Sequence, residues 1–149
     1  MEARRILLVE DDDYDAELTL AALAAAKVGN GVFRVADGAE ALDYLFCRGA
    51  FATRANGLPL VVLLDLKMPK VDGKEVLRQI KADPELRSLL IVVMASSKQD
   101  PNIAECYRLG VNACVVKPVD FEQLTDMVKE IGLCWVLVND LLPGSVGRS

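Results

Sequence analysis

Histidine is the most informative absence from this sequence, which has none among its 149 residues. Without an imidazole, the chain can form neither a Ser-His-Asp triad nor a Cys-His pair, and it offers no histidine ligand to zinc. It also cannot carry a phosphohistidine, so a mechanism that uses one must take it from a partner. These exclusions remove the large groups of hydrolases and zinc enzymes that depend on histidine.

Cysteine is scarce, and no two cysteines are spaced as a metal or redox pair. The four thiols are Cys47, Cys106, Cys114 and Cys134, and none of them forms a Cys-x-x-Cys motif. The spacing therefore predicts neither a zinc site nor a disulfide oxidoreductase. Reduced thiols in a cytoplasmic protein are the simplest interpretation.

Long apolar runs and clusters of positive charge are missing as well. No stretch of 18 apolar residues is present, and the N-terminal segment is too short for a signal peptide, so we expect a cytoplasmic protein without a membrane segment. The net charge is −5 and the 17 basic residues are scattered, which argues against a nucleic-acid partner. With 52% hydrophobic residues, the composition is that of one folded domain.

Short apolar runs alternate five times with helix-favouring segments. The runs predict strands over residues 6–9, 32–35, 60–64, 89–94 and 113–116. The segments between and after them predict helices over residues 15–27, 39–46, 74–81, 102–109 and 121–131, and residues 48–57 read as a loop. Continuously apolar strands joined by helices are typical of a parallel sheet covered on both faces. We therefore expect an α/β fold, a flavodoxin-like (βα)5 doubly wound parallel sheet with strand order 2-1-3-4-5.

Three of the predicted strands end in charged side chains. Glu10 and Asp11 follow the first strand, Asp65 ends the third, and Lys117 ends the fifth. Each charge alone is explained by a solvated strand end, but ligands bind at the carboxyl ends of parallel strands, and all four would face one crevice there. Crowded carboxylates repel one another, and a hard divalent cation such as Mg²⁺ relieves that repulsion. A carboxylate beside a cation and an ammonium group is suited to attack phosphorus.

With these residues in place, the sequence resembles the bacterial response-regulator receiver family over residues 4–131. The matching motifs are Ile6 to Asp12, Leu63 to Pro69 followed by Asp72 and Gly73, and Val115 to Pro118. The resemblance implies that Asp65 accepts a phosphoryl group from a phosphohistidine of a sensor histidine kinase or phosphotransfer protein. It implies that Lys117 contacts the phosphoryl group and precedes a cis proline. Such a phosphoacceptor is a signalling protein rather than a multiple-turnover enzyme.

The resemblance also implies a Mg²⁺ site. Asp11 is expected to bind the ion directly, although Asp12 is adjacent and leaves that assignment open. Glu10 is expected to act through water or as a support. Asp65 and the backbone carbonyl of Lys67 complete the implied ligands.

Two positions depart from the family pattern. The family carries a Thr or Ser hydroxyl after the fourth strand, where this chain has Ala95 followed by Ser96. Either Ser96 substitutes through a small shift in register, or this step is altered. The family often has an aromatic switch residue three positions before the lysine, where this chain has Cys114. We therefore expect intact acceptor chemistry but another route for output, such as dimerisation.

Segments outside the site look similar to small regulators paired with bacterial phytochrome histidine kinases. These segments are Asp37 to Leu45, the long loop before Leu58 and Pro59, Ser96 to Lys98, and Glu130 to Trp135. The resemblance implies a phytochrome-type kinase as partner.

The chain continues past the expected receiver domain, which covers residues 1–131. Residues 132–149 form a tail that begins with six consecutive apolar residues, Leu133 to Val138, and ends in a segment expected to be disordered. The apolar part either folds back on its own domain or packs against a second copy. A homodimer through the tail and the last helix, with Trp135 as anchor, is the expectation that the resemblance favours.

Two other functions fit parts of this pattern. A pseudo-receiver, an interaction module independent of phosphorylation, would explain Ala95 and Cys114 but not the intact acids and lysine. A dehalogenase-type phosphohydrolase also uses an aspartate after a buried strand, but it needs an acid two positions later, where Lys67 stands.

Overall fold

The computed structural model describes residues 6–25, 31–54, 57–68 and 71–130, and it describes residues 128–130 by their backbone alone. The predicted tail, residues 132–149, lies outside the described residues, and so do Pro69, Cys134 and Trp135. Among the helices of the described part, none combines the length and the apolar character that crossing a membrane requires.

Five parallel strands form one sheet. They are β1 (Ile6–Val9), β2 (Val32–Val35), β3 (Val61–Asp65), β4 (Leu90–Ala95) and β5 (Ala113–Val116). Their order is β2-β1-β3-β4-β5, which confirms the predicted flavodoxin-like, doubly wound α/β fold. Every residue of β1 and β3 is buried, because these central strands are covered on both faces.

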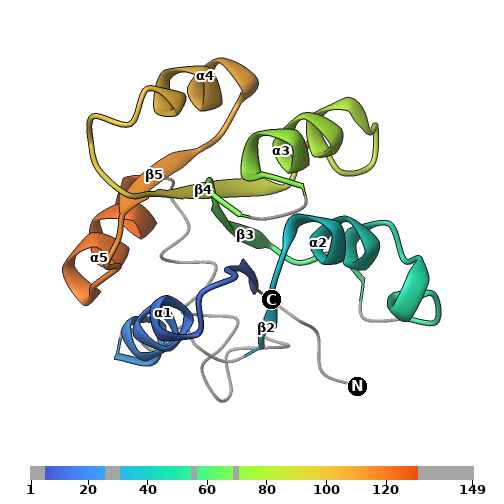
Figure 1. The fold of residues 1–149 in the computed structure, drawn as a ribbon, viewed down its shortest axis with the longest axis horizontal. Helices are drawn as coiled ribbons and strands as arrows, with labels where there is room; N and C mark the ends of the chain where they lie inside the picture. Colours follow the sequence, from blue (N-terminus) through green and yellow to red (C-terminus); the bar gives the residue numbers. More distant parts are fainter. Residues whose placement is uncertain (1–5, 26–30, 55–56, 69–70, 131–149) are drawn as a thin grey trace, which may run out of the picture.

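Five helices cover the sheet. They are α1 (Asp13–Ala25), α2 (Gly38–Leu45), α3 (Gly73–Ala82), α4 (Asn102–Leu109) and α5 (Phe121–Glu130). Helices α1 and α5 lie on one side of the sheet, and α2, α3 and α4 lie on the other (Figure 1). Asp37 and Asp72 cap α2 and α3 by accepting hydrogen bonds from the backbone N–H groups of Glu40 and Glu75.

The core forms two layers, because successive residues of a strand point to opposite faces. Leu7 and Leu64 pack among the residues of α2, α3 and α4, whereas Leu8 and Leu63 pack among those of α1 and α5. Full burial of one leucine stabilises a fold by roughly 1.5–3 kcal/mol. These layers hold the central strands in place, and therefore also the residues that follow them at the carboxyl edge.

The helix and strand boundaries agree with the predicted ones to within two residues, and those of β1, β2, β5 and α4 coincide with them. Helix α1 begins at Asp13 rather than Asp15, because the Asp12 side chain accepts a hydrogen bond from the backbone N–H of Tyr14 and caps the first turn. Strand β4 continues through Ala95, one residue beyond the prediction, because this residue pairs with Val116 of β5.

The predicted loop at residues 48–57 contains a short 3₁₀ turn, η1 (Gly49–Phe51). The Phe51 ring lies 5.8 Å from that of Phe33 and 5.1 Å from that of Tyr44, measured between centroids. The Arg54 guanidinium lies 4.2 Å from the Tyr44 ring centroid on the same cluster. These contacts join residues distant in sequence, so the local pattern gave no sign of them.

Candidate functional site

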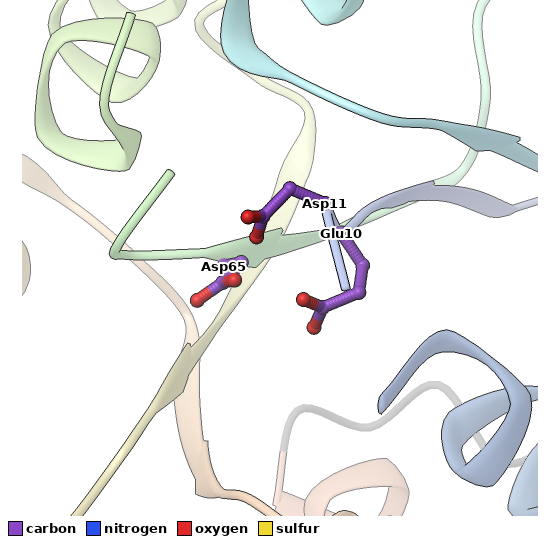
Figure 2. Close-up of side chains that lie close together, drawn as sticks. All are labelled: Glu10, Asp11 and Asp65. Atoms are coloured by element: carbon purple, nitrogen blue, oxygen red, sulfur yellow. The ribbon is translucent and has the colours of Figure 1, made fainter. Parts of the chain in front are cut away.

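The site begins with three acids at the ends of two neighbouring strands. Strands β1 and β3 pair in parallel, with Val9 opposite Leu64, so the residues that follow them emerge side by side. Glu10, Asp11 and Asp65 each place a carboxylate oxygen within 4.8 Å of the other two (Figure 2). Glu10 and Asp65 are buried, and Asp11 is exposed. The predicted acids therefore do meet.

Lys117 reaches this group from the end of β5. Its ammonium nitrogen lies 3.1 Å from Asp65 Oδ2, 3.3 Å from Glu10 Oε1 and 3.2 Å from Asp15 Oδ2. The backbone N–H of Lys117 donates to the carbonyl of Ala95, with an N···O distance of 2.8 Å, which holds this end of β5 against β4. The peptide bond between Lys117 and Pro118 is cis, as predicted.

Burial sets the charge balance of the site. Removal from water, reinforced by the neighbouring Asp65 carboxylate, raises the pKa of Glu10 from 4.5 to about 7. Burial also raises the pKa of Asp65, although the Lys117 ammonium opposes this effect. Burial alone would lower the pKa of Lys117, but Asp65 and Glu10 outweigh it and raise that pKa above its usual value. The site thus holds more negative charge than one ammonium group relieves, which is the condition that favours a bound cation.

Hydrogen bonds fix the two loops that carry the acids. The Glu10 carboxylate accepts from the backbone N–H of Asp12 at 3.1 Å, and the Asp65 carboxylate accepts from that of Lys67 at 3.2 Å. Arg34 of β2 donates twice to the carbonyl oxygen of Glu10, at 2.8 and 3.0 Å. The acids are therefore held by backbone contacts, not only by their own packing.

Glycine is required at the start of α3. A Cβ atom at Gly73 would clash with the carbonyl oxygen of Asp65 and would lie 2.7 Å from Leu66 Cα. The backbone N–H of Gly73 donates to the carbonyl of Leu66 at 3.1 Å. Helix α3 therefore begins directly against the strand end that carries Asp65.

Two residues of the site were missed by the sequence analysis. Arg34 is the only charged residue in an otherwise apolar strand, Val32 to Val35, and that irregularity was a usable signal. Asp15 is one of five acids between positions 10 and 15, and nothing in the sequence separates it from the exposed Asp12 and Asp13.

The residues that depart from the receiver pattern lie at the ends of β4 and β5. Ala95 is buried as the last residue of β4, and Ser96 follows it as an exposed residue. Cys114 is half-buried in β5 and packs against the core layer beneath α2, α3 and α4. Position 95 thus offers a methyl group where the family carries a hydroxyl.

The family model of the response regulator receiver domain matches residues 6–129. The chain belongs to the response regulator receiver family. This membership bears out the expectation of a signalling receiver rather than a phosphohydrolase. The receiver is 40% identical to the probable methanogenesis regulatory protein FilR2 of Methanothrix harundinacea over 131 residues, which cover 88% of this chain and 83% of that protein.

Solved structures of similar receivers include phytochrome response regulators. The bacteriophytochrome response regulator RtBRR is 49% identical, with a TM-score of 0.85 over 97% of this receiver and 87% of that chain. Response regulator Rcp1 of Synechocystis sp. is 33% identical over 88% of each protein. The Mn²⁺-bound form of Rcp1 superposes with a TM-score of 0.71 at 30% identity, over 89% of this receiver and 92% of that chain.

Proposed function

We propose that Asp65 accepts a phosphoryl group from a phosphohistidine of a sensor histidine kinase or phosphotransfer protein. The observation that carries this proposal is the buried Asp65 carboxylate, held 3.1 Å from the Lys117 ammonium beside Glu10 and Asp11. In the transfer, an Asp65 oxygen forms a bond to phosphorus while the phosphorus–nitrogen bond of the phosphohistidine breaks. The electron pair of that bond stays on the imidazole nitrogen, which then takes up a proton.

The acids fit a Mg²⁺ ion, because all three offer hard oxygen ligands within 4.8 Å of one another and two are buried with raised pKa values. Glu10, Asp11 and Asp65 would hold the ion, with the backbone carbonyl of Lys67. When bound, the ion supplies positive charge that offsets the repulsion between these carboxylates and an incoming phosphoryl group. The existence of a Mn²⁺-bound form of Rcp1 supports a divalent cation.

Lys117 and Ser96 complete the proposed acceptor site. Lys117 turns its ammonium group from the Asp65 carboxylate to the phosphoryl oxygens and neutralises part of their charge. Because Ala95 has no hydroxyl, Ser96 supplies the nearest one along the chain after β4.

The partner is a phytochrome-type histidine kinase, a proposal supported by the similarity of this chain to the bacteriophytochrome response regulator RtBRR. The receiver works in the cytoplasm, which agrees with the lack of a disulfide among Cys47, Cys106 and Cys114, the three cysteines that the structure describes. It forms a homodimer through α5 and residues 132–149. A chain truncated at Gly132 that stays dimeric by light scattering would remove the tail from that interface.

Intact mass after incubation with Mg²⁺ and acetyl phosphate tests the acceptor. We expect one added phosphoryl group on the wild-type chain and none on Asp65→Asn, which replaces the nucleophile with a side chain of the same shape. A folded wild-type chain that gains no phosphoryl group from acetyl phosphate or from a kinase would favour the pseudo-receiver, which Ala95 and Cys114 also suit. A dimer that forms only with the adduct would identify dimerisation as the output.

A further inference from the structure

Asp15 contacts the Lys117 ammonium group but is not one of the three clustered acids, Glu10, Asp11 and Asp65. It lies in the first turn of α1, and its Oδ2 is 3.2 Å from the Lys117 ammonium nitrogen. Its side chain is 28% exposed, whereas those of Glu10 and Asp65 are buried. Among the described residues, the carboxylates close enough together to share a cation are those of Glu10, Asp11 and Asp65.

The three partners of Lys117 therefore differ in what else they can bind. Glu10 and Asp65 give the ammonium group oxygens that a divalent cation would also take, so the ammonium and the cation compete for them. Asp15 is the one partner in this set that has no such competitor. An ammonium group displaced from Glu10 and Asp65 still has Asp15 at hydrogen-bond distance.

We propose that Asp15 is a positioning residue that retains the Lys117 ammonium at the rim of the site and shares it with the phosphoryl group. The inference rests on the proposed acceptor function of Asp65. Without Asp15, Lys117 relies on Glu10 and Asp65 alone, so a cation has to displace it from both. Once a phosphoryl group is present, the loss of Asp15 removes the anion that competes with it for Lys117. The ammonium group then interacts more strongly with the phosphoryl group.

Two affinities report these effects with opposite signs. In Asp15→Asn, the affinity for Mg²⁺ should fall, by ~3-fold to ~10-fold, the range for a partly exposed ion pair. The affinity for fluoroberyllate, a mimic of the phosphoryl group on a carboxylate, should rise by a similar factor at saturating Mg²⁺. Both are measured by isothermal titration calorimetry, so neither depends on turnover of the phosphoprotein.

Loss of a negative charge alone would move both affinities in these directions, so a matched control is needed. Glu17→Gln removes the same charge from an exposed position of the same helix, two residues away. We expect it to change either affinity by less than about 2-fold. Asp15→Ser repeats the charge loss with a residue suited to a first helical turn, and thermal unfolding of each variant checks that the fold is kept.

A double-mutant cycle with Lys117→Ala makes the assignment specific. If Asp15 acts through Lys117, Asp15→Asn should have no more effect than Glu17→Gln in the Lys117→Ala background. Equal effects of Asp15→Asn and Glu17→Gln in the wild-type background would overturn the inference while leaving the acceptor function in place. Failure of the wild-type chain to bind fluoroberyllate with Mg²⁺ would overturn the acceptor function, and this inference with it.

Discussion

Two groups of charged side chains in this receiver respond to their surroundings in opposite ways. In the site cluster, defined as Glu10, Asp65 and Lys117, burial raises the pKa of Glu10 to about 7 and raises that of Asp65. In the surface network, Glu105 of α4 lies 3.1 Å from Lys74 and 2.9 Å from Arg78 of α3. Hydrogen bonds from these two cations lower the pKa of Glu105.

The contrast shows what burial does to otherwise similar charge pairs. A carboxylate that stays partly exposed, such as that of Glu105, keeps much of its hydration, so a nearby cation mainly helps it to ionise. Buried carboxylates lose their hydration, and one ammonium group does not compensate two of them. The surface network joins two helices through partly exposed charges, whereas the site cluster keeps two buried carboxylates beside a single ammonium group.

Removal of the only ammonium group from the site cluster should have the largest effect. Lys117→Ala leaves Glu10 and Asp65 facing each other without a cation. In the presence of a metal chelator, we expect the free energy of unfolding to fall by about 3 kcal/mol. This value is at the low end of the range for breaking a buried ion pair, because Glu10 can take up a proton. Urea unfolding measures it, and a loss below about 1 kcal/mol would show that the cluster is better solvated than its burial indicates.

The pH dependence of stability should have opposite signs for the two groups. The folded pKa of Glu10, about 7, lies above its unfolded value of 4.5, so its contribution is fully present below pH 4.5 and is lost as the pH rises toward 7. The folded pKa of Glu105 is lowered, so its contribution is present above pH 4.5 and is lost as the pH falls through the folded pKa. Urea unfolding of the metal-free chain from pH 3.5 to 8 should therefore detect two separate slopes.

Matched variants assign these slopes. Glu10→Gln should reduce the loss of stability between pH 4.5 and 7, to which the raised pKa of Asp65 also contributes, and Glu105→Gln should remove only the acid-side loss. If Glu10→Gln leaves the neutral-side slope unchanged, another group is responsible for it.

Neutralising the acceptor should stabilise the metal-free protein. Asp65→Asn removes a buried carboxylate that repels Glu10 and keeps a polar group near Lys117. In the presence of a metal chelator, we expect the free energy of unfolding to rise by about 1 kcal/mol, since functional sites often lower stability by about this amount. Added Mg²⁺ should then raise the melting temperature of the wild type more than that of the variant, as measured by calorimetry. An equal rise in both would argue against Asp65 as a ligand.

The surface network should give the smallest effect. Glu105→Gln removes the ion pairs between α3 and α4, and we expect the melting temperature to fall by less than about 2 °C. The effect should vanish in 1 M salt, because exposed charges are screened there, while the effect of Lys117→Ala should persist. Gln79→Ala, at a half-buried position of α3, is a control that removes a hydrogen bond between an uncharged side chain and Glu75.

The structure confirms the predicted strands and helices and the predicted clustering of the acids, because both depend on the local sequence pattern. The apolar runs became the five strands in the predicted order, and Glu10, Asp11, Asp65 and Lys117 meet at one edge. Start and end positions shifted where a side chain caps a helix or a neighbouring strand adds a pair, as at Asp12 and Ala95. The aromatic cluster around Phe51 was missed, since it joins residues from three separate segments.

The alternation of strands and helices, and the charged residues that follow the central strands β1 and β3, can be predicted from the amino-acid pattern. Continuously apolar strands require cover on both faces, and parallel strands bring their carboxyl ends to one edge, so these features follow from pattern alone. By contrast, two contacts become visible only in the folded chain: Asp15, and not Asp13, reaches Lys117, and Arg34 donates to the carbonyl of Glu10. Lys117 and Glu10 are 107 positions apart, and contacts over such separations depend on strand order and helix rotation, which no local pattern encodes.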